Sequence, residues 1–410
     1  MSEKEPPAPP RREDLEIIPT SHQGRRALLV RDYLGIIPDP ILLQGDAIEL
    51  LAMLDGRHSL RDLQLEFVRL KGGRIVDSGR LQGLIREFDS AGLLQSPGYE
   101  ERKRKLLADY RKLRVREPSH AGTAYPAEPE ALRTYLDSIL TESRDAGLPG
   151  PGAAVTALVA PHIDLETGRR VYAKAYGSLR GLKPRRVILL GTGHSLEDGV
   201  FCLTDKDFVT PLGRVETDRR AVGRLREAGD GCFSSSDIAH RREHSLEFQL
   251  IFLQHLAGPS FSLVPVLCGS LAQELGRAAA PKDIPGVAGV VSELRALWED
   301  DPSGTIFVAG VDLSHIGPKF GHRERAVFLR AGAEAHDRAL LRAFASGDAN
   351  AFWAEARRVR DRYNVCGLSA LVFLLEIFPG AKGSLLDYDI WMEEPTQSAV
   401  SFAAAVLQAA

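Results

Sequence analysis

Three histidines follow three apolar runs of the sequence at similar positions. The runs AVTALVA, RVILLGT and TIFVAGV are followed by His162, His194 and His315. Apolar runs of this kind are typical of buried parallel strands, and the carboxyl ends of such strands line the ligand crevice of an open α/β sheet. A single histidine there is better explained by a structural hydrogen bond or a surface position, but three at equivalent positions favour a site. Because imidazole binds iron, copper and zinc, the pattern predicts a metal centre.

A cysteine and an aspartate extend this set of candidate residues. Cys366 lies in DRYNVCGLSALVFLLEIF, where Asn364 is expected to cap the apolar helix that follows. The thiol would then lie in the first helical turn, where the positive end of the helix dipole favours thiolate, a strong metal ligand. The alternative is a buried thiol without a chemical role. Asp312 precedes His315 by three residues and either orients a ligand imidazole or caps the following turn.

The segment HRREHSLEFQL places His240 and His244 in the HxxEH spacing of one class of zinc peptidases. Such a site needs both histidines on one face of a continuous helix. The sequence before Glu243 has the character of a loop, so we expect the helix to begin near Glu243 or His244 and to leave His240 outside. His244 and Glu247 are therefore expected to line the pocket or support the ligands, with His244 a candidate catalytic residue. A zinc hydrolase is the less favoured alternative.

A repeating pattern of strands and helices from about Ala121 onward must position these residues. Apolar strand candidates alternate with helical segments such as GRRVYAKAYGSLRGL and HSLEFQLIFLQHL. This alternation predicts a layered αβα fold with a mostly parallel central sheet. The strand candidates cover residues 154–160, 186–192, 261–269, 305–311 and 398–407, and residues 200–213 and 383–391 are candidates for antiparallel or edge strands.

The first part of the chain is organised differently. Three short helices are expected between about Leu42 and Leu94, with Ser59 as an N-cap and Gly92 just after the last helix. The first residues are rich in proline and charge, a composition typical of disorder. The expected segments are a disordered tail at 1–14, a small, mainly helical winged-helix-like domain at 15–98, a basic linking helix at 99–118 and the metal-site domain at 119–410.

Composition narrows the class of protein. The 410 residues, 44% hydrophobic and 26% charged, suffice for one large domain and one smaller domain. A formal net charge of -3 gives no reason to expect nucleic acid or an anionic membrane as a partner. The N-terminus lacks the apolar core of a secretory signal, and no run of about 18 apolar residues is present, so we expect a cytoplasmic protein.

The order of several short motifs identifies a family that this chain resembles. From about Ala121 to the C-terminus the sequence is similar to the Memo family, also called AmmeMemoRadiSam system protein B. The motifs that carry the resemblance are AGTAYPAEPEAL, LVAPHIDLETG, VILLGTGHS, TPLGRVETD, EHSLEFQL, LVPVLCG, VDLSHIG, NVCGLSA and SAVSFAAAV.

The resemblance to the Memo family implies a fold similar to class III extradiol ring-cleaving dioxygenases and a metal pocket. Carried over by motif, the ligands are His162, His194 and Cys366, with His315 as a further ligand or general base and Asp312 beside it. The implied metal is Fe(II), with copper or zinc as alternatives. Dioxygenases of this fold have a carboxylate where this chain has the cysteine, which puts extradiol activity in doubt. A further departure is PHIDLETG, which brings Asp164 and Glu166 near the pocket in place of an aromatic-rich segment.

Two functions follow from these resemblances. The first is a mononuclear non-haem metal oxidoreductase that acts on an unknown small molecule or peptide. The alternative is a non-catalytic peptide-binding or scaffold component that works with a radical SAM partner protein. Residues 42–94 resemble, over a short stretch, the winged-helix domain of PqqD-like peptide-recognition proteins, which would give that region a recruiting role.

Overall fold

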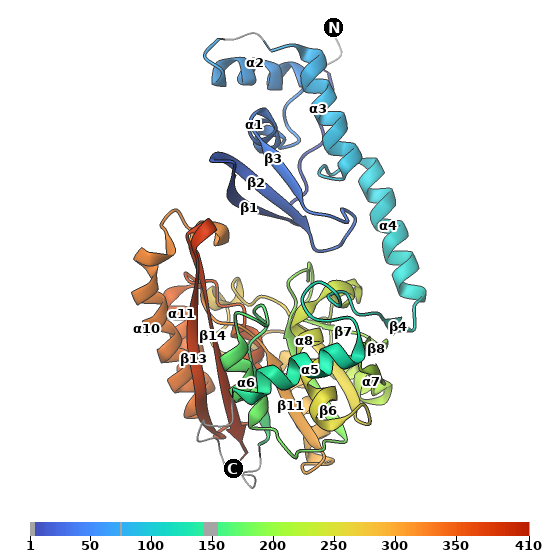
Figure 1. The fold of residues 1–410 in the computed structure, drawn as a ribbon, viewed down its shortest axis with the longest axis vertical. Helices are drawn as coiled ribbons and strands as arrows, with labels where there is room; N and C mark the ends of the chain where they lie inside the picture. Colours follow the sequence, from blue (N-terminus) through green and yellow to red (C-terminus); the bar gives the residue numbers. More distant parts are fainter. Residues whose placement is uncertain (1–4, 74–75, 143–154, 410) are drawn as a thin grey trace. The chain divides into compact units, whose positions relative to one another are not determined.

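The protein is divided into two units, each with its own hydrophobic core. A computed structural model describes residues 5–73, 76–142 and 155–409. Unit 1 is Met1–Lys112 and unit 2 is Leu113–Ala410. Figure 1 shows the elements of both units in chain order.

Unit 1 begins with a three-stranded antiparallel sheet that the sequence analysis did not predict. The strands β1 (Leu15–His22), β2 (Arg25–Asp32) and β3 (Ile41–Gln44) pair in that order. Gln23 and Gly24 connect β1 to β2 with φ angles of 51° and 70°, which is the two-residue turn that suits the twist of a hairpin. The Gln23-Gly24 pair was the feature of the sequence that could have indicated this hairpin. The unit therefore adds this sheet to helices that still make up most of its regular structure.

The three short helices expected in unit 1 are present. They are α1 (Asp46–Met53), α2 (Leu60–Leu70) and α3 (Ser78–Ala91), and the basic helix α4 spans Pro97–Lys112. Ser59 caps α2 by accepting a hydrogen bond from the backbone of Asp62, and Gly92 ends α3 with a left-handed φ of 83°. Both caps were predicted, because they depend on local sequence alone.

Residues 5–14 are ordered, which corrects the expectation of a disordered tail over 1–14. The backbone N–H groups of Arg11 and Arg12 donate to the carbonyls of Leu54 and Leu93, each at 2.9 Å. The Arg12 side chain is buried and forms ion pairs with Asp14 and Asp32. From composition alone, an arginine is expected to be exposed to solvent. Here Arg12 is buried because two carboxylates balance its charge and a backbone carbonyl accepts one of its hydrogen bonds. Residues 1–4 lie outside the described residues.

Unit 2 contains the predicted layered αβα domain. In its described part, an eight-stranded sheet has the order β12-β14-β5-β11-β6-β10-β7, with β13 paired to β14. The four central strands are parallel, and β14 and β7 run antiparallel to their neighbours. The strands are β5 (Ala157–Ala160), β6 (Arg186–Thr192), β7 (Phe201–Leu203), β10 (Ser262–Cys268), β11 (Thr305–Gly310), β12 (His315–Ile316), β13 (Lys382–Glu393) and β14 (Ser398–Gln408).

Most strand candidates of the sequence became strands close to their expected bounds. The candidate at 154–160 begins later, at Ala157, and its first residue lies outside the described residues. The stretch 200–213 contributes β7 to the large sheet. It also supplies β8 (Asp207–Thr210), which with β9 (Gly213–Val215) and β4 (Val115–Arg116) forms a separate small sheet.

Helices cover both faces of the large sheet (Figure 1). Neighbouring strand residues such as Leu158 and Val159 belong to opposite cores, because side chains alternate across a strand. One core includes side chains from α5 (Pro129–Thr141), α6 (Arg169–Gly177) and α8 (His244–Ala257). The other includes side chains from α7 (Arg219–Ala228), α9 (Val287–Glu299), α10 (Ala326–Ala345), α11 (Ala349–Val359) and α12 (Leu368–Ile377).

Two glycines let the first turn of α8 lie directly on the ends of the central strands. Gly310 of β11 is in register with Gly191 of β6. A Cβ atom at Gly191 would lie 2.5 Å from the Ser245 hydroxyl oxygen, and one at Gly310 would lie 2.2 Å from the Ser245 carbonyl oxygen. Larger residues would therefore displace the helix start. This contact places His244, the first residue of α8, beside the loops that leave the parallel strands.

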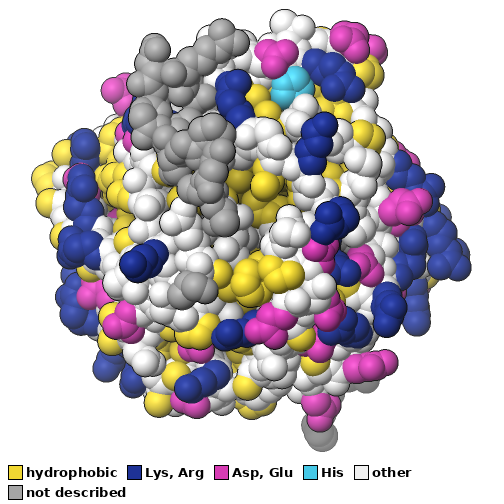
Figure 2. Space-filling view, turned by 90° about the horizontal axis from the view of Figure 1, so that it is seen from below, with side chains coloured by type: hydrophobic (Ala, Val, Ile, Leu, Met, Phe, Trp, Pro, Cys, Tyr) yellow, Lys and Arg dark blue, Asp and Glu magenta, His cyan; other side chains and the backbone are white. Residues whose placement is uncertain are grey.

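The surface gives little further indication of function. On the face shown in Figure 2, basic, acidic and apolar side chains are intermingled. Among the described residues, none of the helices combines the length and the apolar character that a bilayer span requires.

Candidate metal centre

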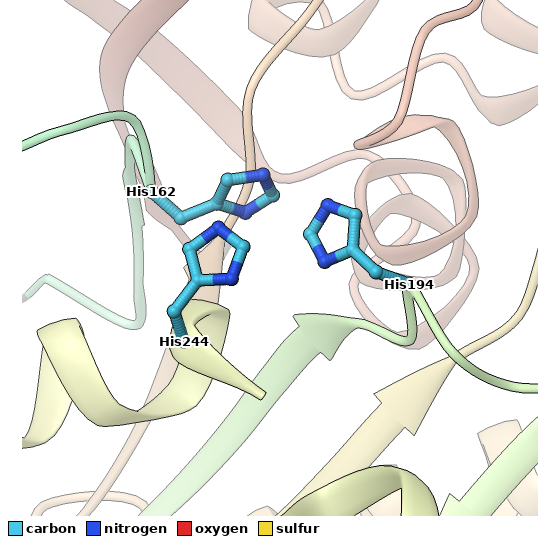
Figure 3. Close-up of side chains that lie close together, drawn as sticks. All are labelled: His162, His194 and His244. Atoms are coloured by element: carbon cyan, nitrogen blue, oxygen red, sulfur yellow. The ribbon is translucent and has the colours of Figure 1, made fainter. Parts of the chain in front are cut away.

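Three imidazoles meet at the carboxyl edge of the parallel strands (Figure 3). One nitrogen each of His162, His194 and His244 lies within 4.8 Å of the other two. His162 follows β5, His194 follows β6 and His244 begins α8. The ring centroids are 4.8 to 5.1 Å apart. Nitrogen donors this close are suited to share one metal ion.

Hydrogen bonds anchor the Nδ1 atoms of these rings. His162 Nδ1 lies 2.9 Å from the carbonyl oxygen of Gly310, which can only accept, so Nδ1 carries the proton. His194 Nδ1 lies 3.0 Å from a carboxylate oxygen of Glu243. In both rings Nδ1 is engaged in its hydrogen bond, so Nε2 is the nitrogen that can coordinate a metal. Burial lowers the pKa of His162, but Asp312 and Cys366 outweigh it and raise that pKa to about 9, so a metal ion that binds there would displace a proton from Nε2.

The Glu243 carboxylate contacts two of the three imidazoles, those of His194 and His244. It lies 3.3 Å from His244 Nδ1 and accepts hydrogen bonds from the backbone N–H groups of His194 and Ser245. Burial raises the pKa of Glu243, but the neighbouring histidines and these hydrogen bonds outweigh it and hold that pKa well below its usual range. Glu243 is thus an anionic group that orients two of the three imidazoles and caps α8.

We expect Glu243→Gln to weaken metal binding about 10- to 100-fold, the usual effect of removing a carboxylate that orients ligand histidines. Glutamine keeps the size of the side chain and an oxygen that can cap α8, but it loses the negative charge shared by His194 and His244. Competition with a chelator measures the dissociation constant, and the thermal midpoint serves as the control for folding. An affinity equal to that of the wild type would show that Glu243 acts only as a helix cap.

Cys366 lies against the same imidazoles. Its Sγ atom is 3.5 Å from His162 Nε2 and 3.4 Å from the carbonyl oxygen of Asp312. Burial raises the pKa of the thiol, but the charges of His162 and His315 and hydrogen bonds from His162 and His194 outweigh it and lower that pKa to about 5. The sulfur is therefore a thiolate at neutral pH, the form that binds metals.

The expected cause of this thiolate was wrong. Asn364 has a left-handed φ of 49° and does not cap the helix; its amide donates to the carbonyls of His315 and Phe320, each at 3.1 Å. The helix α12 begins at Leu368 with Gly367 as its N-cap, so Cys366 precedes the first turn. Neighbouring imidazoles, rather than the helix dipole, lower the pKa of the thiol.

Asp312 and His315 occupy different positions relative to the cluster. One oxygen of Asp312 accepts hydrogen bonds from the backbone of His162 and Ile163, and the other lies 3.7 Å from His162 Nε2. Asp312 therefore holds the backbone that carries His162, and its second oxygen faces the ring of that histidine. His315 lies outside the three-imidazole group: its ring packs on Phe320, with 4.9 Å between ring centroids, and its Nδ1 is 2.9 Å from the carbonyl of Leu313.

The HxxEH histidines are separated, as the loop-like sequence indicated. His240 lies in a short 3-10 helix, Ile238–Arg242, and its Nε2 atom is 3.1 Å from the carbonyl of Cys202. Burial lowers the pKa of His240 to about 4, which is expected for a neutral structural histidine. Because α8 begins at His244, the two histidines do not share a continuous helix. The zinc-peptidase arrangement is absent from the described residues.

Glu247 lies close to the cluster, whereas Asp164 and Glu166 lie on the surface. Glu247 is buried three residues after His244 on α8, and it binds Arg116 and the backbone of His120. The His120 ring lies 5.7 Å from the His244 ring, measured between centroids, so Glu247 lies beside the cluster. Asp164 and Glu166 are exposed, and the Asp164 carboxylate accepts a hydrogen bond from the backbone of Glu166 within their own turn.

Sequence reasoning did not identify His244 as a donor. It was assigned a catalytic or supporting role because it was judged only against the zinc-peptidase pattern. The sequence did place His244 at the start of an apolar helix, next to the acidic cap residue Glu243. It did not show that this helix start would pack on Gly191 and Gly310, which brings His244 to the other imidazoles.

The fold and the cluster define an α/β protein with a group of imidazoles and a thiolate at the carboxyl edge of a parallel sheet. The sequence profile of the family described as Memo-like protein matches residues 116–406. The chain therefore belongs to the Memo-like family.

Curated relatives support this assignment. A MEMO1 family protein of Aquifex aeolicus is 29% identical over 386 residues, which cover 92% of this chain and 95% of the relative. A MEMO1 family protein of Thermus thermophilus is 28% identical over 356 residues, covering 86% of this chain and all of the relative. A third, from Aeropyrum pernix, is 32% identical over 287 residues, covering 67% of this chain and 92% of the relative. The bacterial alignments therefore extend into unit 1.

Proposed function

We propose that this protein is a mononuclear non-haem metal oxidoreductase with His162, His194 and Cys366 as its ligands. The observation that carries the proposal is the Cys366 sulfur 3.5 Å from an imidazole nitrogen of His162, whose other ring nitrogen is anchored to a backbone carbonyl. Two nitrogens and one sulfur suit Fe(II), the metal that we favour, and also copper or zinc. A bound ion would supply Lewis-acid and one-electron chemistry.

The chain's own residues would bind the substrate and move protons. Asp312 holds the backbone of His162 in place, and Glu243 holds the ring of His194. His315 has its Nδ1 tied to a carbonyl, so its Nε2 is the nitrogen that would exchange a proton with a substrate as general acid or base. The substrate class is an unknown small molecule or peptide. A reducing, cytoplasmic location is the setting that we propose for this thiolate.

The test begins with protein purified anaerobically and loaded with Fe(II). We expect one ion per chain and consumption of O₂ when catechols and related small molecules are added. His315→Ala should keep the ion and slow O₂ consumption about 10²- to 10⁴-fold, the usual contribution of a general acid or base. A protein that binds one ion but consumes no O₂ with any compound would contradict the oxidoreductase assignment and favour the function described next.

A cavity in unit 1 favours a second candidate function, a peptide-binding scaffold. The cavity has a volume of about 610 Å³ and is lined by residues of β2, β3, α1 and α3, including Arg26, Gln44 and Leu84. It lies beside β3, an edge strand of the three-stranded sheet, and a sheet edge can accept an extended peptide as an added strand. The partner that we propose is a radical SAM enzyme. Leu84→Glu should abolish its capture by the full chain, whereas His162→Ala should not.

A further inference from the structure

The site offers more donor atoms than one three-coordinate set can use. Cys366 contacts His162 through its sulfur and also forms a hydrogen bond with His194. His244 places a nitrogen within 4.8 Å of a nitrogen of each of the same two residues. Two sets of three donors therefore share His162 and His194 and differ in the third member, which is sulfur in one set and nitrogen in the other.

His244 is held in place independently of the cysteine. Its Nδ1 lies 3.3 Å from the Glu243 carboxylate, and its ring packs edge-to-face on Phe248 with 5.4 Å between centroids. The helix turn that carries it rests on Gly191 and Gly310. Loss of Cys366 would leave this ring where it is.

Cys366 is supported differently. It lies in the segment between Tyr363 and the start of α12, outside regular secondary structure. It is partly exposed, and its sulfur contacts the imidazoles and the carbonyl of Asp312. Its backbone N–H donates to the carbonyl of Leu313 at 3.4 Å, and its carbonyl accepts from the Thr192 hydroxyl at 3.3 Å. The nitrogen set, His162, His194 and His244, therefore has its third donor on a helix start packed against the sheet. The sulfur set, His162, His194 and Cys366, has its third donor in the segment before a helix.

We propose that the centre has two overlapping donor sets and that a metal ion moves from His162, His194 and Cys366 to His162, His194 and His244 when the sulfur ceases to be a ligand. The proposal rests on the proposed metal-binding function. It makes His162 and His194 indispensable and Cys366 the exchangeable ligand, whose position an incoming substrate can take without release of the ion. The soft sulfur set favours thiophilic ions, and the nitrogen set suits Zn²⁺ and Co²⁺ equally well.

The test uses Co²⁺ alone as the probe, with the full chain as wild type, Cys366→Ala, His244→Ala and the double variant. We expect one Co²⁺ per chain in both single variants, each bound at most about 100-fold more weakly than in the wild type. The double variant keeps only two of the donors, so its loss of affinity should exceed the product of the two single losses. Sulfur-to-cobalt absorption in the near ultraviolet should be present in His244→Ala and absent from Cys366→Ala.

Specific results would overturn the proposal. If Cys366→Ala binds no Co²⁺, or if the double variant binds as tightly as Cys366→Ala, His244 is not an alternative donor. A different result would contradict the proposed metal-binding function itself. In that case the wild type would bind no metal, or His162→Ala would bind it as well as the wild type does. Cys202→Ala is the matched control: this cysteine is buried, with its sulfur 3.3 Å from the carbonyl of Ser236, and its removal should leave the absorption intact. Circular dichroism of each variant checks that the fold is retained.

Discussion

His194→Ala will remove metal binding from this protein, with a dissociation constant raised by more than about 100-fold. Loss of groups that only orient a ligand costs about 10- to 100-fold, so loss of a direct ligand should cost more. His194 belongs to both donor sets, and among the described residues the cluster contains no further imidazole that could take its place at the end of β6. Metal analysis after gel filtration and chelator competition give the stoichiometry and the affinity.

The control for this prediction is His58→Ala. His58 is a histidine of unit 1 that is paired with Asp55, so its removal tests whether any lost imidazole lowers the metal content. Added imidazole should restore part of the binding in His194→Ala, because it can enter the space left by the ring. Stoichiometric metal in His194→Ala would mean that the ion lies elsewhere, and the proposed centre would be wrong.

Arg116→Ala is expected to destabilise unit 2 by about 3–5 kcal/mol, the usual cost of removing one partner of a buried ion pair. Arg116 is 1% exposed and forms an ion pair with Glu247, which is equally buried. Its guanidinium also donates to the carbonyls of His240 and Glu243 at 3.0 and 2.8 Å. The variant would leave a buried carboxylate without a cation and two carbonyls without their donor, because the alanine side chain provides neither.

Urea unfolding followed by circular dichroism measures this effect. Arg116→Lys should recover only part of the loss, because an ammonium group cannot reproduce the several directed hydrogen bonds of the guanidinium. Arg114→Ala is the matched control: Arg114 is exposed, and its removal should change the free energy of unfolding by no more than about 0.5 kcal/mol. Equal stabilities of Arg116→Ala and Arg114→Ala would show that the buried network does not stabilise the unit.

The Arg116 network also bears on the candidate centre. Glu247 lies one helical turn after Glu243 and His244, and its carboxylate accepts hydrogen bonds from Ser119 and Tyr125. The segment that opens unit 2 is thus fixed to the same helix turn that presents His244. Because the imidazoles sit at a helix start and at strand ends, stability and metal affinity are expected to fall together in Arg116→Ala.

Much of unit 2 was determined by sequence alone. Runs such as RVILLGT are apolar throughout because they are buried on both faces, and this pattern gave the strands, the parallel sheet and the loops in which His162 and His194 lie. Equivalent positions after two strands of one parallel sheet were enough to predict that these two imidazoles meet. Caps such as Ser59 were predictable for the same reason, since they depend on residues within one turn.

Other features were decided only by the tertiary structure. Three strand-end histidines are equivalent in sequence, yet the loop after β11 turns His315 onto Phe320, and α8 brings His244 to the two remaining imidazoles. The lowered pKa of the Cys366 thiol arises from the rings of His162, His194 and His315, which lie far from it in sequence. The order of residues 5–14 arises from carboxylates and carbonyls elsewhere in unit 1. Hydrophobic periodicity and local propensity indicate whether a residue is buried and whether it lies in a helix, a strand or a loop. Which side chains meet depends on how elements pack across intervening loops, and that packing is set by contacts such as Ser245 on Gly191.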